Sequence, residues 1–146
     1  MIKECEQVID LKVTSLRPMS ILMVEDNKLD ALLASEILSE SGNFLYQIEE
    51  VKDGVDAMAY LRRCCDAGNT LPDLILLDLN LPRMNGFEFL GELAKAKGFR
   101  TIPVIVLTTS SDEEDIERVQ DVVDSYLIKP LDLEEFERSV SRISRR

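Results

Sequence analysis

Carboxylate, hydroxyl and ammonium side chains directly follow four short apolar segments of this sequence. Glu25 and Asp26 follow the first of them, and Asp78, Thr108 and Lys129 follow the other three. Carboxylates held close together repel one another by several kcal/mol at an effective dielectric constant of about 20, so such a group calls for a cation. Because the chain contains no histidine, the ligands are all oxygen atoms, which favours a hard metal ion such as Mg²⁺.

The same residue types fit the transfer of a phosphoryl group. Bound Mg²⁺ would neutralise the incoming group, and Lys129 would offer a second positive charge to its oxygens. Thr108 could donate a hydrogen bond from its hydroxyl group to a phosphoryl oxygen. Asp78 needs no general base, because its carboxylate can attack directly as the nucleophile and form an acyl phosphate.

The residue types that are present and absent exclude several other kinds of active site and partner. The absence of histidine excludes Ser/His/Asp triads and histidine-ligated zinc. Cys5, Cys64 and Cys65 have no metal-ligand spacing, and we interpret them as reduced packing residues of a cytosolic protein. Lys and Arg number 17 against 28 Asp and Glu, and the net charge of -11 argues against direct binding to DNA or RNA.

Length and composition fit one globular domain. A chain of 146 residues, 45% of them hydrophobic, is long enough to bury a full core. No apolar run approaches the ~18 residues that a membrane span requires. Glu4 and Glu6 interrupt any apolar core of a signal peptide, so we expect a cytoplasmic protein without membrane contact.

The elements that must position these residues alternate along the chain. Apolar runs and amphipathic helical patterns in turn indicate βαβ units, and therefore a parallel sheet with helices on both faces. The carboxyl ends of parallel strands meet at one edge, so we expect the polar residues to share one crevice. Strands are predicted at 21–24, 46–51, 74–77, 104–107 and 126–128, and helices at about 29–38, 54–64, 86–97, 113–123 and 133–146.

Apolar residues at helical spacing predict which side of each helix is buried. Asp112 is expected to cap the fourth helix, and Asp132 with Glu135 forms the pattern of a capping box for the last one. Arg142, Arg145 and Arg146 would complement the dipole at the end of that helix. The predicted buried residues are Leu29, Leu32, Leu33, Ile37 and Leu38 of the first helix, Val55, Met58, Ala59 and Leu61 of the second, Phe87, Phe89, Leu90 and Leu93 of the third, and Ile116, Val119, Val122 and Val123 of the fourth.

Residues 1–19 lie outside the alternation, and we treat them as an N-terminal extension to a domain at 20–146. Ile9, Leu11 and Val13 alternate with polar residues, which is compatible either with an added edge strand or with an extension that does not pack.

Four segments in order resemble the receiver domain of two-component response regulators over about residues 20–143. They are ILMVEDN (21–27), LILLDLNLPRMNG (74–86), VIVLTTS (104–110) and YLIKP (126–130). The resemblance implies a flavodoxin-like (βα)5 fold, with a five-stranded parallel sheet in the order 2-1-3-4-5. It also implies that the protein is a signalling switch and not an enzyme.

The resemblance assigns a role to each matching residue. Asp78 matches the phosphoacceptor, Glu25 and Asp26 match the acid pair that binds Mg²⁺ with it, and Asn80 matches the position whose backbone carbonyl joins the metal. In the same way, Thr108 and Lys129 match the residues that contact the phosphoryl group, and Tyr126 matches the aromatic residue that swings inward when the threonine moves. The bond from Lys129 to Pro130 is expected to be cis.

The resemblance also implies partners. The stretches DGVDAMAYLRR (53–63) and PDLILLDLNLP (72–82) are similar to stand-alone receivers that partner phytochrome-type histidine kinases. We therefore expect phosphoryl transfer from a histidine kinase or a phosphotransfer protein. Only one helix is expected after Pro130, so the output should be contact with a downstream protein target or transfer of the phosphoryl group onward, and not DNA binding. A homodimer through the fourth helix, fifth strand and fifth helix is also compatible with the resemblance.

The sequence departs from the family pattern before the fifth strand. Val122, Val123 and Asp124 stand where most receivers have a Gly-Ala pair. Without glycine a left-handed helix end is disfavoured, so we expect a connection of different shape. Thr109 is larger than the residue that many receivers carry there, and it could narrow access to the site.

Three other functions fit these residues less well. A haloacid-dehalogenase-type phosphatase would need a second acid at position 80, where this chain has Asn80. A flavodoxin-like electron carrier would need a hydroxyl-rich loop after the first strand, but Glu25 and Asp26 would repel the phosphate of FMN. A receiver fold used only for constitutive docking would not need the acids, the threonine and the lysine together.

Overall fold

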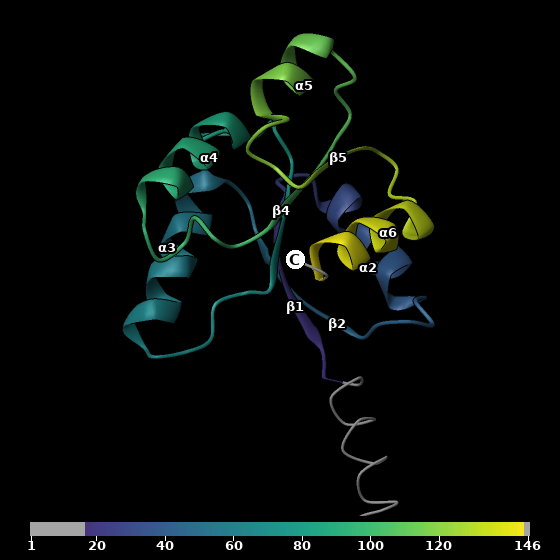
Figure 1. Cartoon of the computed structure of the whole chain (residues 1–146), viewed down its shortest axis with the longest axis horizontal. Coiled ribbons are helices and arrows are strands. Elements are labelled where there is room, and N and C mark those ends of the chain that lie inside the picture. Colours follow the sequence, from purple (N-terminus) through teal and green to yellow (C-terminus); the bar gives the residue numbers. More distant parts are fainter. Residues whose placement is uncertain (1–16, 145–146) are drawn as a thin grey trace, which may run out of the picture.

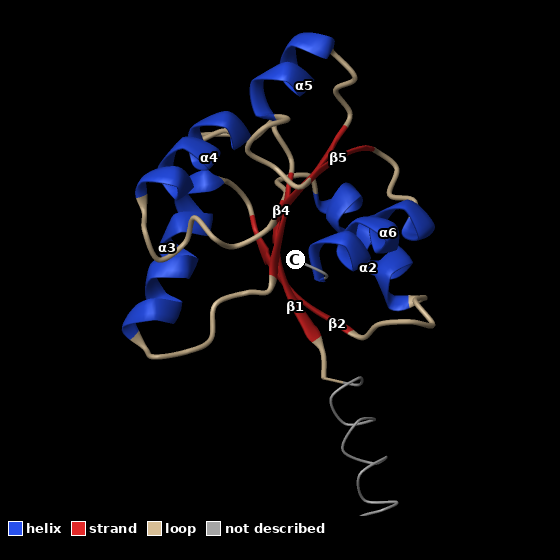
Figure 2. Ribbon diagram, viewed as in Figure 1, coloured by secondary structure: helices blue, strands red, loops and turns tan. Residues whose placement is uncertain are grey.

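A five-stranded parallel sheet forms the centre of the molecule. The structure, a computed structural model, describes residues 17–144. The strand order is β2-β1-β3-β4-β5, which confirms the predicted flavodoxin-like topology. Figure 2 shows the strands in red between the helices. The strands are β1 (Met19–Val24), β2 (Tyr46–Val51), β3 (Leu74–Leu77), β4 (Val104–Thr108) and β5 (Ser125–Ile128), each within two residues of its predicted bounds.

Helices cover both faces of the sheet, as Figure 1 shows. The helices α2 (Lys28–Ser39) and α6 (Leu133–Ser144) pack on one face, and α3 (Gly54–Asp66) and α4 (Gly86–Lys95) pack on the other. The short helix α5 (Glu113–Val119) adds Val119 to the same side as α3 and α4. None of the helices in the described part of the chain has the length and apolar character needed to cross a membrane.

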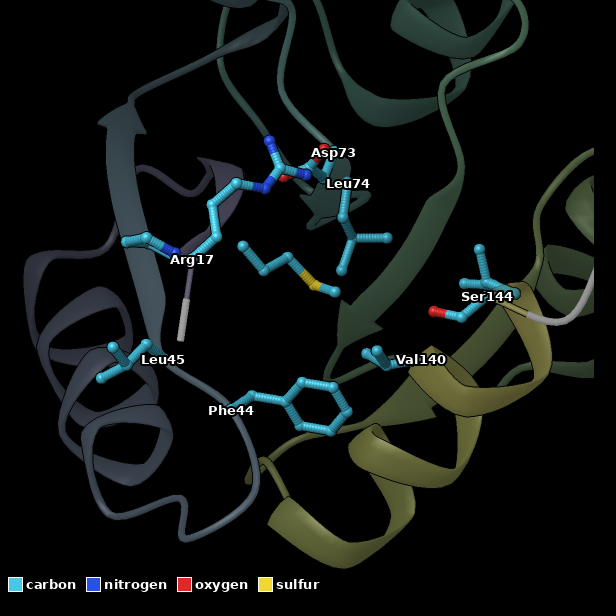
Figure 3. Close-up of a pocket in the computed structure, with 10 residues that line it drawn as sticks. Arg17, Phe44, Leu45, Asp73, Leu74, Val140 and Ser144 are labelled. Atoms are coloured by element: carbon cyan, nitrogen blue, oxygen red, sulfur yellow. The ribbon is translucent and has the colours of Figure 1, made fainter. Parts of the chain in front are cut away.

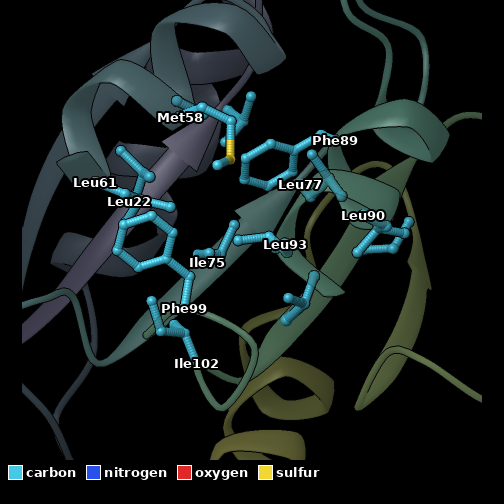
Figure 4. Close-up of a cluster of buried hydrophobic side chains, with 14 of the residues drawn as sticks. Leu22, Met58, Leu61, Ile75, Leu77, Phe89, Leu90, Leu93, Phe99 and Ile102 are labelled. Atoms are coloured by element: carbon cyan, nitrogen blue, oxygen red, sulfur yellow. The ribbon is translucent and has the colours of Figure 1, made fainter. Parts of the chain in front are cut away.

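Strand residues alternate between two apolar clusters, one on each face. In β3, Ile75 and Leu77 join the cluster under α3 and α4, which Figure 4 shows around Phe89. Leu74 and Leu76 join the other cluster, under α2 and α6. The four residues are at most 2% exposed. A run of consecutive aliphatic residues therefore fits a strand that is covered on both sides.

The buried side of α2 differs from the prediction. Leu38 is buried, but Leu29, Leu32 and Leu33 are 76%, 56% and 49% exposed. The helix instead faces the sheet with Ala31 and Ala34, whose small side chains are both buried. Ile37 is half-buried against the same cluster as Leu38, so the prediction holds for Ile37 and Leu38 and is wrong for the three leucines, because hydrophobicity alone cannot distinguish an alanine face from a leucine face.

Smaller corrections apply to the other helices. Val55 and Val122 are exposed, whereas Ala57, which the prediction left out, is fully buried. Phe87, Ile116 and Val123 are only partly buried. Val55 lies in the first turn of α3, and Val122 lies beyond the end of α5, so neither is held against the sheet.

The connection from α5 to β5 is formed without a left-handed residue. Helix α5 ends at Val119 instead of continuing to residue 123, and the N–H groups of Val122 and Val123 both donate to its carbonyl oxygen. The Asp124 N–H donates to the Val104 carbonyl at 2.8 Å, and the Asp124 side chain accepts from the Val104 N–H at 2.9 Å. The only positive φ angles in the described chain are at Gly68 and Arg83, so the connection contains no left-handed residue, and its difference in shape from other receivers stays a prediction.

The predicted cap of α5 and the cis bond are confirmed, whereas the predicted capping box of α6 is half formed. Asp112 accepts from the Glu114 N–H, and Asp132 accepts from the Glu135 N–H, but among the described residues no hydrogen bond returns from the Glu135 side chain to the Asp132 N–H. The peptide bond between Lys129 and Pro130 is cis. Arg142 donates to the hydroxyl groups of Ser125 and Ser139, whereas residues 145 and 146, like the N-terminal extension up to residue 16, lie outside the described chain.

Candidate functional site

Three carboxylates gather at the carboxyl ends of two adjacent strands. Glu25 and Asp26 follow β1, and Asp78 follows β3, its neighbour in the sheet. One oxygen from each of these side chains lies within 4.8 Å of the others. Parallel pairing of β1 with β3 brings the residues after each strand to the same edge, as the sequence predicted.

Lys129 contacts this group from the end of β5. Its Nζ atom lies 2.7 Å from Glu25 Oε1 and 3.1 Å from Asp78 Oδ2. The Lys129 backbone N–H donates to the carbonyl oxygen of Thr108 at 2.8 Å, which fixes the start of the side chain beside β4. The lysine is therefore an internal counter-ion of the acid cluster.

A fourth carboxylate, Asp30, was not among the predicted site residues. Its Oδ2 atom lies 2.8 Å from Lys129 Nζ. Asp30 belongs to the first turn of α2, which Asn27 caps by accepting from the Asp30 N–H. An acidic residue in the first turn of a helix is favoured by the helix dipole whatever its contacts, so no specific signal in the sequence identified Asp30.

Burial and charge oppose each other in this cluster. Burial raises the pKa of Glu25, a hydrogen bond from Lys129 counteracts it, and the charge on Asp78 raises it further. For Lys129, burial disfavours the ammonium form, but hydrogen bonds to Asp30 and Glu25 outweigh it and raise the lysine pKa. With one ammonium facing four carboxylates, the fully ionised group carries a net charge of -3, which a divalent cation would reduce.

The other predicted site residues lie around the cluster in different ways. Thr108 ends β4 and is fully buried, and its Oγ1 accepts a long hydrogen bond of 3.4 Å from the Ser110 N–H. Asn80 lies in the loop after β3, and its N–H donates to Asp78 Oδ1 at 3.2 Å. Within residues 17–144, no hydrogen bond joins Thr108 to the carboxylates.

Tyr126 of β5 is tied to the loop that follows β4. Its hydroxyl group donates to the Ser110 carbonyl oxygen at 2.8 Å. Its ring packs partly against the core cluster under α3 and α4. Burial raises the pKa of Tyr126, so the hydroxyl keeps its proton for this bond at neutral pH.

A separate pocket lies at the opposite end of the sheet. It has a volume of about 440 Å³, and its lining includes Met19, Phe44, Leu74 and Val140 (Figure 3). Met19 and Leu74 begin β1 and β3, whereas the acid cluster follows the ends of these strands. Its lining contains one acidic residue, Asp73, whereas the acid cluster found among residues 17–144 lies at the other edge.

Comparison with known proteins agrees with this geometry. The family model described as "Response regulator receiver domain" matches residues 21–141. A curated protein named "Probable methanogenesis regulatory protein FilR2", from Methanothrix harundinacea, is 42% identical over 127 residues, which cover 86% of this chain and 81% of that protein. The response regulator Rcp1 of Synechocystis sp. is 39% identical over 128 residues, which cover 86% of each chain.

Two solved structures extend the comparison. The phosphorylated cyanobacterial phytochrome response regulator RcpA is 41% identical and superposes with a TM-score of 0.70 over 87% of this chain and 91% of its own. The Mn²⁺-bound form of Rcp1 is 38% identical, with a TM-score of 0.69 over 86% of this chain and 91% of its own.

Proposed function

Because the chain belongs to the family of response regulator receiver domains, we propose that Asp78 accepts a phosphoryl group in two-component signalling. The donor is the phosphohistidine of a histidine kinase or of a phosphotransfer protein. One observation carries the proposal, namely that the buried Asp78 carboxylate lies beside two further acids and in contact with Lys129. A nucleophile, a place for a metal ion and a positive side chain thus meet at one point.

The proposed step exchanges one bond to phosphorus for another. A carboxylate oxygen of Asp78 attacks the phosphorus atom, and the P–N bond of the phosphohistidine breaks with its electron pair kept by the imidazole nitrogen. A P–O bond to Asp78 forms, which gives an acyl phosphate on this chain and a free histidine on the donor. Lys129 would hold the oxygens of the transferred group from its present position.

The metal in this proposal is Mg²⁺, held by Glu25, Asp26 and Asp78 through their side chains and by Asn80 through its backbone carbonyl. The donor set supports it, because three carboxylates lie close together and Lys129 leaves their charge incompletely compensated. When bound, Mg²⁺ neutralises negative charge on the phosphoryl oxygens. The Mn²⁺-bound form of Rcp1 shows that a similar chain takes a divalent ion.

Thr108 and Tyr126 would connect the reaction to the protein surface. Thr108 would donate a hydrogen bond to the phosphoryl group, and Tyr126 is bonded to Ser110, two residues further along the same loop. Movement of this loop therefore changes the environment of the tyrosine. The output would be contact of the surface formed by α5, β5 and α6 with a downstream protein or with a second copy of the chain.

The exposed leucines of α2 suggest where the phosphoryl donor binds. Leu33 lines a groove of about 290 Å³ together with Thr109, Lys129 and Pro130, directly beside the acid cluster. Leu29 and Leu32 are exposed on the same helix. We propose a phytochrome-type histidine kinase as the donor, because RcpA is a phytochrome response regulator.

Labelling with a small phosphodonor tests the proposed reaction. Acetyl phosphate or phosphoramidate with Mg²⁺ should add one phosphoryl group, measured as the intact mass of the chain. Asp78→Asn should gain no mass, and removal of Mg²⁺ with a chelator should prevent the gain in the unchanged chain. No gain of mass in the unchanged chain would exclude Asp78 as a phosphoacceptor.

A further inference from the structure

The loop between β3 and α4 contains an uncommon backbone conformation. Arg83 has a φ of 59°, in the left-handed region that non-glycine residues rarely adopt. This loop also carries Asn80, whose backbone is proposed to join the metal. A residue keeps such a conformation when its surroundings hold it there.

The side chain of Arg83 reaches the start of α3. Its Nε atom donates to Asp53 Oδ2 at 2.7 Å, and its Nη2 atom donates to Asp53 Oδ1 at 3.3 Å. Asp53 is 3% exposed and caps α3 by accepting from the Asp56 N–H at 2.9 Å. The carboxylate is thus fixed by the helix on one side and engages the guanidinium group through both oxygens.

The backbone of the loop also approaches α3 closely. The Gly54 N–H donates to the Met84 carbonyl oxygen at 2.9 Å. A Cβ atom on Gly54 would lie 2.6 Å from Met84 Cγ and 2.8 Å from its carbonyl oxygen, closer than side chains pack. Glycine at the first position of α3 therefore permits this contact.

The two ends of the loop between β3 and α4 are in contact. The Gly86 N–H donates to the Leu79 carbonyl oxygen at 3.0 Å. A Cβ atom on Gly86 would lie 2.7 Å from the backbone oxygen of Asp78. Asn80 thus lies in a short loop whose two ends meet, and whose far side rests on α3.

We infer that the ion pair between Asp53 and Arg83 positions the metal-binding loop. This pair, called the loop clamp below, fixes residues 83 and 84 on α3 and with them the orientation of the Asn80 backbone toward Asp78. The inference rests on the proposed function, because it concerns the same metal site. Arg83 and Asp53 are positioning residues, and only the loop that they hold would contact the ion.

Titration with Mg²⁺, followed by calorimetry on the full chain, tests the loop clamp. Arg83→Gly keeps the backbone conformation accessible and removes the ion pair, so it should weaken Mg²⁺ binding by about tenfold, as loss of an outer partner of a metal ligand does. Labelling by acetyl phosphate should then require more Mg²⁺ and recover at saturating Mg²⁺. This shift in the Mg²⁺ requirement is not expected from a loss of stability alone.

Asp56→Asn is the matched control. Asp56 also contacts Arg83, at 2.9 Å, but its side chain is 44% exposed and its removal leaves the Asp53 contact in place. By the same calorimetry, the Asp56→Asn variant should bind Mg²⁺ with an affinity within twofold of that of the unchanged chain. Arg83→Lys keeps the charge but loses the bidentate contact, so its affinity for Mg²⁺ should lie between those of the unchanged chain and Arg83→Gly. This variant provides the test if Arg83→Gly does not fold.

The outcomes separate the two proposals. If the unchanged chain binds Mg²⁺ and is labelled, but Arg83→Gly and Arg83→Lys bind Mg²⁺ equally well, the loop clamp is wrong and the phosphoacceptor proposal stands. If the unchanged chain neither binds Mg²⁺ nor becomes labelled, both proposals are wrong.

Discussion

Lys129 is the residue on which the electrostatics of the site depend. Its ammonium group contacts Glu25, Asp30 and Asp78, and only 11% of its side chain is exposed. A buried charge without its partner is costly, whereas a buried pair is roughly balanced. In the absence of a metal ion, the ammonium group of Lys129 offsets part of the negative charge that these carboxylates bring together.

Substitution Lys129→Met should expose this dependence. The loss of the cation should lower the free energy of unfolding by about 3 kcal/mol without Mg²⁺, because buried carboxylates lose their counter-ion. Mg²⁺ should then restore stability to the variant by more than it adds to the unchanged chain, measured by urea unfolding with and without the ion. Equal increments in both proteins would contradict this account.

The exposed pair of Lys95 and Glu92 provides the control for that measurement. Their side chains are 76% and 39% exposed. Lys95→Met should leave the free energy of unfolding unchanged within error, because exposed pairs contribute little. The increase in stability on adding Mg²⁺ should also stay the same.

At the scale of elements, α2 combines a small-residue face toward the sheet with a leucine face toward solvent. Ala31 and Ala34 are buried, whereas Leu29 and Leu32 are more than half exposed. Exposed apolar patches that adjoin a functional site commonly mark an interaction surface. The same helix carries Asp30, so the proposed donor surface and one charge of the site belong to one element.

Leu32→Ser should separate donor binding from chemistry. The rate of phosphoryl transfer from a histidine kinase that phosphorylates the unchanged chain should fall by about fivefold, equivalent to about 1 kcal/mol at an interface. Labelling by acetyl phosphate should not change, since the small donor does not use the helix surface. Leu45→Ser, at a residue 52% exposed near the other end of the sheet, is the control, and an equal loss there would argue against α2 as the docking surface.

In the turn after α5, the glycine that most receivers carry should destabilise this chain. No residue from 120 to 124 has a positive φ, so glycine would bring no advantage there. Val122→Gly should lower the free energy of unfolding by about 0.5–1 kcal/mol, because it adds freedom to the unfolded chain. Thermal unfolding measures this, and a gain in stability would show that the turn is strained by valine.

The sequence predicted elements better than it predicted contacts. The four aliphatic residues Leu74–Leu77 indicated a strand because burial on both faces leaves a pattern that can be read along the chain. The buried side of α2 could not be read in this way, because its alanines and leucines are both apolar. Asp53 and Arg83 are 30 residues apart in the sequence, and no local pattern relates them. Their contact could therefore be found only from the folded structure.

Across the whole molecule, polar contacts join the elements that cover the face of the sheet under α2 and α6. Glu137 of α6 makes three of them with the loop after α2 and the start of β2. It accepts hydrogen bonds from the side chains of Ser41, Asn43 and Tyr46, and it is 9% exposed. This carboxylate connects the two helices that cover one face of the sheet.

The stability of the molecule should depend on pH through Glu137. Burial raises the pKa of Glu137, but the three hydrogen bonds outweigh it and hold the pKa below its ordinary value of 4.5. A depressed pKa stabilises the fold above pH 4.5, and this contribution is lost as the pH falls through the folded value. Glu137→Gln should therefore lower the free energy of unfolding by about 2 kcal/mol at pH 7, and by less as the pH falls below 4.5.

Urea unfolding of both proteins from pH 7 to pH 3 measures this difference. Glu134→Gln, in a side chain that is 85% exposed on the same helix, should show no such convergence. A difference between Glu137→Gln and the unchanged chain that stays constant over this range would assign the effect to packing and not to charge.

The outer edge of β2 has a consequence for the protein at high concentration. Among the described residues, β2 pairs only with β1, so one side of its backbone pairs with no other strand in that part of the chain. Gln47, Glu49 and Glu50 are exposed along it. Acidic side chains on an open edge repel the same edge of a second copy, which protects the sheet from growing into aggregates.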